Sequence, residues 1–223
     1  GEDHVTNTAA QVELIAALGG KVPEFAHFSL MLGADGSGLS KRLGSLALAD
    51  LRASGLEPIS LSAHIARLGT ADPVVPVQTL QEIVDGFDMS RLGRAPARFD
   101  PEDVVRLNAR ILHETPYALV ADRLAEIGAP AQADFWEAMR GNIEKFADMQ
   151  NIMALINGPI TPVVEAEVAD YIRQARALLP DAPLSLESWS VWTGQLKHES
   201  GRKGRALFMP LRMALTGQSH GPE

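Results

Sequence analysis

The segment DPEDVVRLNARILHE, residues 100–114, decides the fold class of this chain. Asp100 is a typical N-cap, Pro101 fits the first turn of a helix, and the acids that follow face the positive helix end. Apolar residues then recur at intervals of three and four, at Val104, Leu107 and Ile111. This spacing predicts an amphipathic helix whose apolar stripe packs in a core.

Helical spacing continues on both sides of this segment. The longest signal runs from Asp134 to about Ile156, and Gly158-Pro159 ends it. A short apolar run, Phe25 to Leu32, predicts one buried strand that ends at Gly33. Further helices are predicted over residues 8–18, 46–53, 58–68, 80–87, 161–179, 185–196 and 207–215. The chain is therefore predicted to be mainly α, with its strand near the beginning.

Composition narrows the class of protein. The 223 residues are 46% hydrophobic and 22% charged, which excludes wholesale disorder and allows one large or two small domains. There is no cysteine, and no two of the six histidines are three or four residues apart. We therefore predict no metal site and a reducing, cytoplasmic location. No apolar run is long enough for a membrane span.

The net charge of −8 is unusual for a dedicated nucleic-acid module, although a local basic stripe can still bind nucleic acid. The chain lacks an initiator Met and begins Gly1-Glu2-Asp3-His4. We expect from this that it is part of a longer protein.

A glycine-rich segment, Gly33 to Ser45, contains the adjacent cations Lys41 and Arg42. Such loops commonly bind phosphates. Two familiar phosphate motifs fail on spacing, because a P-loop would need lysine at position 39 and a dinucleotide fingerprint would need glycine at position 41. Taken alone, the segment fits a solvated surface turn better than a phosphate site.

Four segments together resemble bacterial glutamyl-tRNA synthetases, a family of class I aminoacyl-tRNA synthetases. Leu39-Ser40-Lys41-Arg42 is similar to the second class I signature, the Lys-Met-Ser-Lys-Ser loop. The other three segments with counterparts in the family are Gly1 to Thr8, Phe99-Asp100 with Leu107-Asn108, and Lys203 to Arg212 with Ala214 to Gly217. Their order along the chain matches the order in the family.

The resemblance implies the carboxy-terminal half of a synthetase, because the first class I motif, His-Ile-Gly-His, is absent. Residues 1–99 would be a remnant of the α/β nucleotide-binding domain, with one or two short strands, followed by helices that contact the tRNA stem. Residues 100–223 would be a helical anticodon-binding region. Glutaminyl relatives carry β-barrels there, which the helical spacing does not favour.

The resemblance also implies site residues. Lys41 matches the lysine that contacts ATP phosphates during adenylate formation and is the predicted catalytic residue. Ser40 and Arg42 flank it, and Asp3 and His4 match positions beside the nucleotide pocket. Gly38 stands where the family has its first lysine. No metal ligand is predicted, since Mg²⁺ would accompany ATP in the parent enzyme, and the chain alone would bind no cofactor tightly.

The implied partners are tRNA for glutamate, or for glutamine, together with the glutamate and ATP that the full-length parent would use. Phosphate contacts are expected from basic residues on loops and helices, because such contacts are independent of sequence: Arg91, Arg94, Arg106, Arg110, Lys203 and Arg205. Trp189 and Trp192 could stack on bases, but at this helical spacing they are more often core. We expect a monomer with no membrane partner.

Two other classes remain open. A helical RNA-binding or protein-interaction module without a catalytic parent would explain the helices and basic loops, but not the four ordered segments. A phosphate-binding enzyme acting by itself would need a second nucleotide motif. Within the ligase interpretation, this chain alone is predicted to be inactive.

Overall fold

The computed structural model describes residues 1–39, 47–182 and 184–221. The chain divides into two compact units, residues 1–149 and 150–223. In the first unit the elements are η1 (Glu2–His4), α1 (Val5–Ala17), β1 (Met31–Gly33), α2 (Leu48–Ala53), α3 (Pro58–Arg67), α4 (Leu80–Asp85), η2 (Met89–Arg91), β2 (Ala97–Phe99), α5 (Pro101–Glu114), η3 (Tyr117–Leu119), α6 (Ala121–Glu126), α7 (Ala133–Met139) and η4 (Arg140–Asn142). From α8 (Asp148–Asn157) onward they are η5 (Ala166–Val168), α9 (Ala169–Ala177), α10 (Leu186–Ser200) and α11 (Arg205–Thr216).

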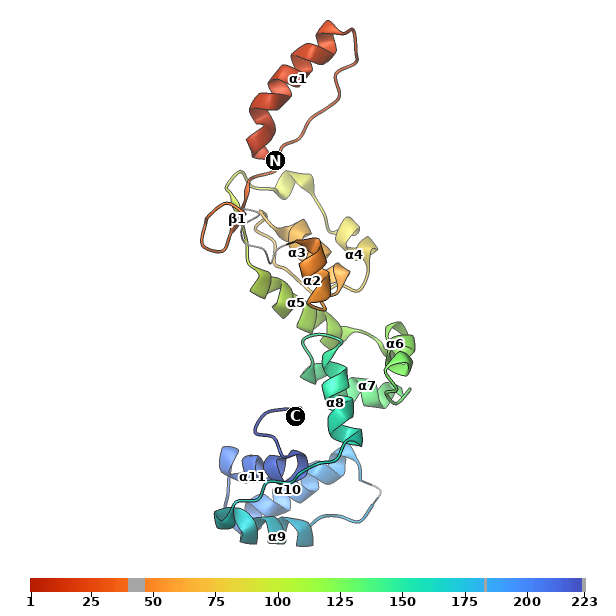
Figure 1. The fold of residues 1–223 in the computed structure, drawn as a ribbon, viewed down its shortest axis with the longest axis vertical. Helices are drawn as coiled ribbons and strands as arrows, with labels where there is room; N and C mark the ends of the chain where they lie inside the picture. Colours follow the sequence, from red (N-terminus) through yellow and green to blue (C-terminus); the bar gives the residue numbers. More distant parts are fainter. Residues whose placement is uncertain (40–46, 183, 222–223) are drawn as a thin grey trace. The chain divides into compact units, whose positions relative to one another are not determined.

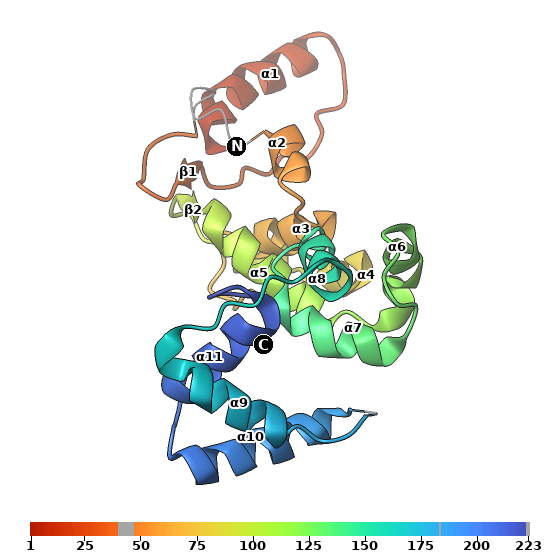
Figure 2. The same ribbon diagram turned by 60° about the horizontal axis from the view of Figure 1, so that its bottom comes forward.

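Helix α5 forms as its sequence predicts. The Asp100 carboxylate accepts the backbone N–H of Glu102, and Pro101 occupies the first turn. The predicted stripe of Val104, Leu107 and Ile111 is buried. Helix α3 packs beside α5, and the two lie side by side in both ribbon views (Figures 1 and 2). The mainly α fold class is confirmed.

A buried amide side chain on α5 holds three segments together. The Asn108 Oδ1 atom accepts the Glu57 N–H at 2.8 Å, at the residue that precedes α3. Its Nδ2 atom donates to the Glu144 carbonyl at 2.6 Å, in the segment between η4 and α8. The Asn108 side chain is fully buried, and both hydrogen bonds that it makes are partly buried.

The predicted strand at 25–32 is wrong in extent. Only Met31 to Gly33 pairs, in parallel register with Ala97 to Phe99. The predicted burial is also wrong, because the side chains of Phe25 and Phe28 are exposed. A strand forms only where a neighbour supplies hydrogen bonds, and β1 has a partner over three residues. Sequence reasoning missed β2, which lies in a basic, proline-containing segment.

The single helix predicted over residues 134–156 is also wrong, because α7 and α8 are separate helices. Gly141, in η4, disfavours a continuous helix. The Asp148 carboxylate accepts the backbone N–H groups of Glu144 and Lys145, which forms a local turn instead. The spacing of three and four still marked core residues, since Ile143, Phe146, Met149 and Met153 are buried.

The second unit packs α9, α10 and α11 around one core (Figure 1). Its buried cluster comprises Tyr171, Ala175, Trp192, Leu196, Leu207 and Leu211. The helix predicted from residue 161 starts only at η5, and the exposed Val164 precedes it. Helix α10 begins as predicted, at a capping box between Ser185 and Ser188.

We predict that Asn108→Ala lowers the free energy of unfolding by about 1–3 kcal/mol, because the Glu57 N–H and the Glu144 carbonyl lose the partner that Asn108 supplies. Urea denaturation followed by circular dichroism measures the effect. Asn151→Ala, at an exposed position of α8, is the control and should change stability by less than about 0.5 kcal/mol. Equal effects of the two substitutions would contradict this role of Asn108.

Candidate functional site

The predicted phosphate loop starts at the carboxyl end of β1, where ligands commonly bind in parallel sheets. Its first part is a tight turn. Gly33 N–H donates to the Ser37 carbonyl at 2.8 Å, and the Asp35 carboxylate accepts both the N–H and the hydroxyl of Ser37. Gly36 has a φ of 80°, which favours glycine. The predicted residues Ser40, Lys41 and Arg42 lie outside the described residues.

Arg98 is a site residue that our sequence prediction missed. It lies on β2, paired with Leu32 of β1, and its guanidinium lies next to Gly36 in the turn. Hydrogen bonds from Ser37 lower the pKa of the Asp35 carboxyl, and the charge of Arg98 contributes in the same direction. Only knowledge of the parallel register could have placed this cation beside the loop.

The predicted nucleotide-pocket residues Asp3 and His4 lie in or next to η1 and are exposed to solvent. The His4 Nε2 and Asp3 Oδ2 atoms are 3.8 Å apart. Beside them is a pocket of about 360 Å³ whose polar lining includes Glu2, His27 and Arg94. The structure therefore brings Arg94, predicted as a tRNA contact, close to the same amino-terminal segment as Asp3 and His4.

The predicted tRNA-binding residues fall into two groups. Three of them make contacts within the chain: Arg91 pairs with Asp72 at 2.8 Å, Arg106 pairs with Asp103 at 2.7 Å, and Arg110 donates to the Val74 carbonyl at 3.2 Å.

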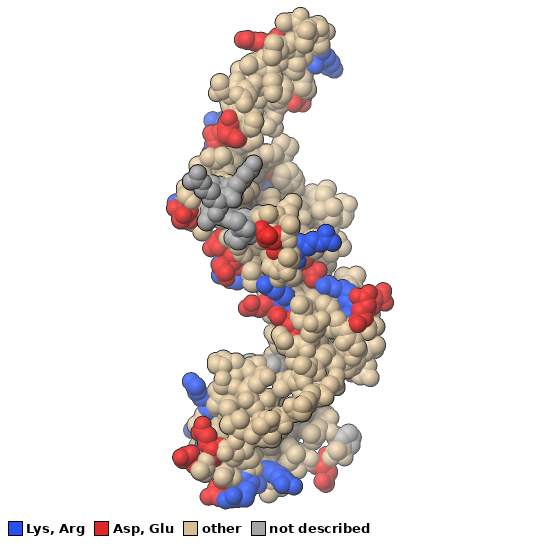
Figure 3. All heavy atoms as spheres, viewed as in Figure 1, with Lys and Arg blue, Asp and Glu red and all other residues tan. Residues whose placement is uncertain are grey.

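The other three, Arg94, Lys203 and Arg205, make no side-chain hydrogen bond or ion pair with any other described residue. On the face shown in Figure 3, basic and acidic side chains alternate in each unit without a large patch of one sign.

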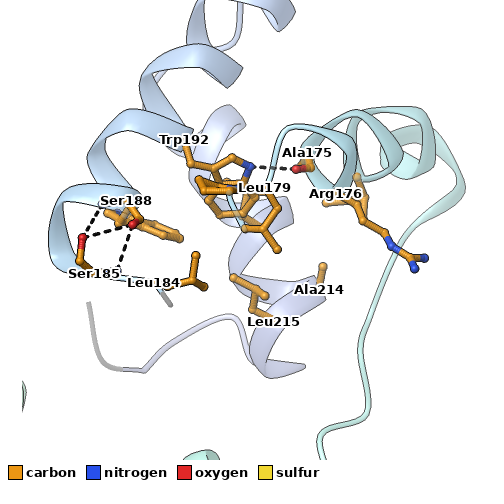
Figure 4. A pocket seen from close by; sticks show the side chains of 13 residues that line it. Ala175, Arg176, Leu179, Leu184, Ser185, Ser188, Trp192, Ala214 and Leu215 are labelled. Atoms are coloured by element: carbon orange, nitrogen blue, oxygen red, sulfur yellow. Dashed lines mark hydrogen bonds between the residues drawn. The ribbon is translucent and has the colours of Figure 1, made fainter. Parts of the chain in front are cut away.

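The second unit contains an apolar pocket of about 480 Å³ between α9, α10 and α11 (Figure 4). Trp192 belongs to the core, as expected, and its Nε1–H donates to the Ala175 carbonyl at 2.8 Å. Trp189 lines the same pocket, has 45% of its surface exposed, and meets the Trp192 ring edge-on at 5.4 Å. The polar atoms around it come mainly from Ser185 and Ser188, which cap α10.

Neither a metal site nor a membrane span stands out in the described part of the chain. No group of three or more His, Asp or Glu side chains is arranged to hold a metal ion among residues 1–39, 47–182 and 184–221. Within the same residues, no helix combines the length and apolar character needed to cross a bilayer.

Comparisons with known proteins show which family the chain resembles. Residues 1–105 match the model of class I tRNA synthetases (E and Q), catalytic domain. The chain is similar along its whole length to "Glutamate--tRNA ligase 1" of Maricaulis maris, at 50% identity, and to "Glutamate--tRNA ligase 2" of Hyphomonas neptunium, at 49% identity. In both cases it spans 50% of the relative.

Two solved structures share the fold. One is a glutamate tRNA ligase from Elizabethkingia meningosepticum in complex with its amino acid, with a TM-score of 0.74 and 23% identity. The other is glutamate-tRNA synthetase from Elizabethkingia anophelis, with a TM-score of 0.70 and 23% identity. All of this chain is covered, and 51% of each solved chain.

Residues 1–105 therefore resemble the catalytic domain of class I tRNA synthetases of the glutamate and glutamine type. The chain as a whole is similar to glutamate–tRNA ligases, and it spans about half the length of the curated relatives that it matches. The family resemblance predicted from the four segments is confirmed. A helical module without a catalytic parent would not account for the catalytic-domain match.

His64 is a buried titratable group outside both pockets. It packs against Phe99, with ring centroids 5.5 Å apart, and neither ring nitrogen hydrogen-bonds to any described residue. Burial lowers the pKa of His64 below its ordinary value of 6.5, and the charges of Asp103 and Asp100 oppose this shift only partly. Shifted pKa values often mark catalytic sites, but this position indicates a core residue.

The lowered pKa of His64 predicts a loss of stability in acid. As pH falls below about 6.5 the unfolded chain binds a proton that the folded chain does not, so the free energy of unfolding decreases. His64→Leu should remove this part of the pH dependence, measured by urea denaturation between about pH 7.5 and 5.5. His198→Gln, at an exposed position, should keep the wild-type slope. Identical slopes for His64→Leu and wild type would refute the assignment.

Proposed function

We propose that this chain is the carboxy-terminal half of a glutamate–tRNA ligase and supplies the ATP-phosphate loop and the tRNA-binding surface of that enzyme. The observation that carries the proposal is the 50% identity to a glutamate–tRNA ligase over the entire chain. The parent reaction joins glutamate to ATP with release of pyrophosphate, and then transfers the glutamyl group to the 3′ end of tRNA.

The phosphate loop would act through Lys41, with Ser40 and Arg42 beside it. A flexible ammonium can stay close to the pyrophosphate as its negative charge grows. Two features support a phosphate site here: a tight glycine turn at the end of a parallel strand, and the Arg98 guanidinium next to Gly36. Mg²⁺ fits this chemistry as an ion that is bound mainly by the ATP phosphates and water.

Asp3 and His4 would lie beside the nucleotide in the complete catalytic domain. The pocket formed with Glu2, His27 and Arg94 supports a binding role for this amino-terminal segment. Residues 1–99 would form the catalytic and stem-contact part, and residues 100–223 the anticodon-binding part. We further propose a monomeric, cytoplasmic protein whose partner is tRNA for glutamate or glutamine.

The tRNA contacts would come first from basic side chains that have no acidic partner among the described residues. Lys203 and Arg205 meet this condition and lie together at the start of α11. Arg94 meets it in the first unit. Arg91 and Arg106 would have to exchange their ion pairs with Asp72 and Asp103 for phosphate contacts, which lowers the gain from binding.

This chain alone should form no glutamyl adenylate. The sequence lacks the first class I nucleotide motif, and one loop cannot position ATP and glutamate together. Glutamate-dependent pyrophosphate exchange, measured with tRNA present, should therefore equal that of a Lys41→Ala control. Exchange clearly above that control would show that the chain forms the adenylate without a partner.

The chain should still bind tRNA, with a strong dependence on salt. Replacing Lys203 and Arg205 by Ala should flatten the slope of log affinity against log salt by about 1.4 to 1.8, for two lost phosphate contacts. Cognate and non-cognate tRNA should be affected alike. Fluorescence anisotropy across a salt series provides the measurement.

A double Ala variant of Arg106 and Arg173 is the matched control for this experiment. Both residues are exposed but paired with acids three positions away, so the slope should stay close to wild type. If the control variant flattens the slope as much as the Lys203 and Arg205 variant does, the proposal that the unpaired cations contact the tRNA phosphates is wrong.

A further inference from the structure

Arg98 is an exposed cation on a strand whose other two residues are buried. Ala97 and Phe99 of β2 point into the core, and Arg98 projects from the opposite face, as the alternation of side chains along a strand requires. Among the described residues, the Arg98 guanidinium makes no hydrogen bond and no ion pair. Its charge is therefore open to an anionic ligand.

The acid beside Arg98 is engaged within its own turn. The charge of Arg98 acts on the Asp35 carboxyl, but this carboxylate accepts the N–H and the hydroxyl of Ser37. Arg106, by contrast, would have to leave Asp103 before it could bind a phosphate. Arg98 can bind a phosphate without breaking an ion pair to any described residue.

Strand pairing places Arg98 and Gly38 on the two sides of Leu32. Leu32 pairs with Arg98 in the parallel register of β1 and β2, and with Gly38 in an isolated antiparallel bridge. Residues that pair directly across neighbouring strands project their side chains from the same face. A side chain at position 38 would therefore project from the same face as Arg98, at about 10 Å, which is twice the spacing of neighbouring strands.

The space over this face is open. A Cβ atom at Gly38 would meet no described atom within 4 Å. A Cβ atom at Gly36 would lie 3.7 Å from the Arg98 Nη2 atom, so the guanidinium reaches from β2 to the turn of residues 33–38. Glycine lets a ligand approach the backbone closely. The face thus offers a cation beside open glycine backbone, a combination that suits a phosphate group.

We propose that Arg98 is a phosphate-binding residue of this chain, which supplies from β2 the positive charge that position 38 lacks. This inference rests on the proposed function and adds a contact for the ATP phosphates. The resemblance to the synthetases places a lysine at position 38, where this chain has Gly38. The Arg98 guanidinium projects from the same face and can donate two parallel hydrogen bonds to one phosphate group.

The test uses the 223-residue chain with inorganic pyrophosphate as the probe. Binding is followed by heteronuclear NMR at the amides of Gly33, Gly36 and Gly38, whose signals should shift as pyrophosphate is added. Arg98→Met should weaken binding by about fivefold or more, because it removes a charge-assisted contact. Arg106→Met is the matched control and should bind as the wild type does, since Arg106 is exposed but already paired.

A rescue variant separates phosphate binding from a structural role of Arg98. Lysine fits at position 38, because the backbone φ there is not positive and no described atom crowds its Cβ. Gly38→Lys in the Arg98→Met background should restore the affinity for pyrophosphate to within about twofold of the wild type, as a cation on the same face. Urea denaturation should show equal stability for Arg98→Met and the wild type, because an exposed side chain without a partner contributes little to folding.

Three results would overturn the proposal: no shift at the three glycines, equal affinity of Arg98→Met and the wild type, or a loss of affinity that Gly38→Lys does not restore. The anisotropy measurement of tRNA binding does not involve this face. Pyrophosphate binding without tRNA binding would therefore count against the proposed function, and tRNA binding without a pyrophosphate response would count against the role of Arg98.

Discussion

The buried side chain of Asn108 is the interaction on which the first unit depends. A buried amide needs hydrogen-bond partners, and Asn108 finds them in the backbone of two segments that are far apart in sequence. The entry to α3 and the link between η4 and α8 are thereby fixed to α5. His64 of α3 packs against Phe99 of β2, so α3 supports the strand pair at whose end the predicted phosphate loop begins.

A second constraint acts at the sheet. A parallel strand pair gains little from its own few hydrogen bonds, and its stability comes from neighbouring strands and covering helices. Among the described residues, only the isolated bridge between Leu32 and Gly38 extends the pairing of β1 beyond β2, and many apolar side chains of residues 1–30 are exposed. The position of Arg98 beside the loop depends on this short pairing.

Local signals made parts of the structure predictable. The cap at Asp100 and the stripe on α5 act within one turn or one helix, and both formed as expected. The helix predicted from Ser185 also begins there, at a capping box that the structure shows. The break at Gly141 was missed because apolar spacing continued across it. The strand β2 and the role of Arg98 were missed because they depend on pairing between residues about 66 positions apart, for which one sequence gives no signal.

The charge of the chain limits how tRNA could approach it. At −8 overall, long-range attraction to an anionic partner is absent, and binding must rely on short-range contacts. Arg106 and Arg173 already form ion pairs with aspartates on their own helices. Exchanging such an aspartate for a tRNA phosphate would therefore add little to the free energy of binding. Lys203 and Arg205 have no such ion pair to break among the described residues. The expected difference between these two pairs of residues depends on whether each cation already has an acidic partner, and not on the number of cations. For this reason, counting basic residues in the sequence does not locate the proposed tRNA interface.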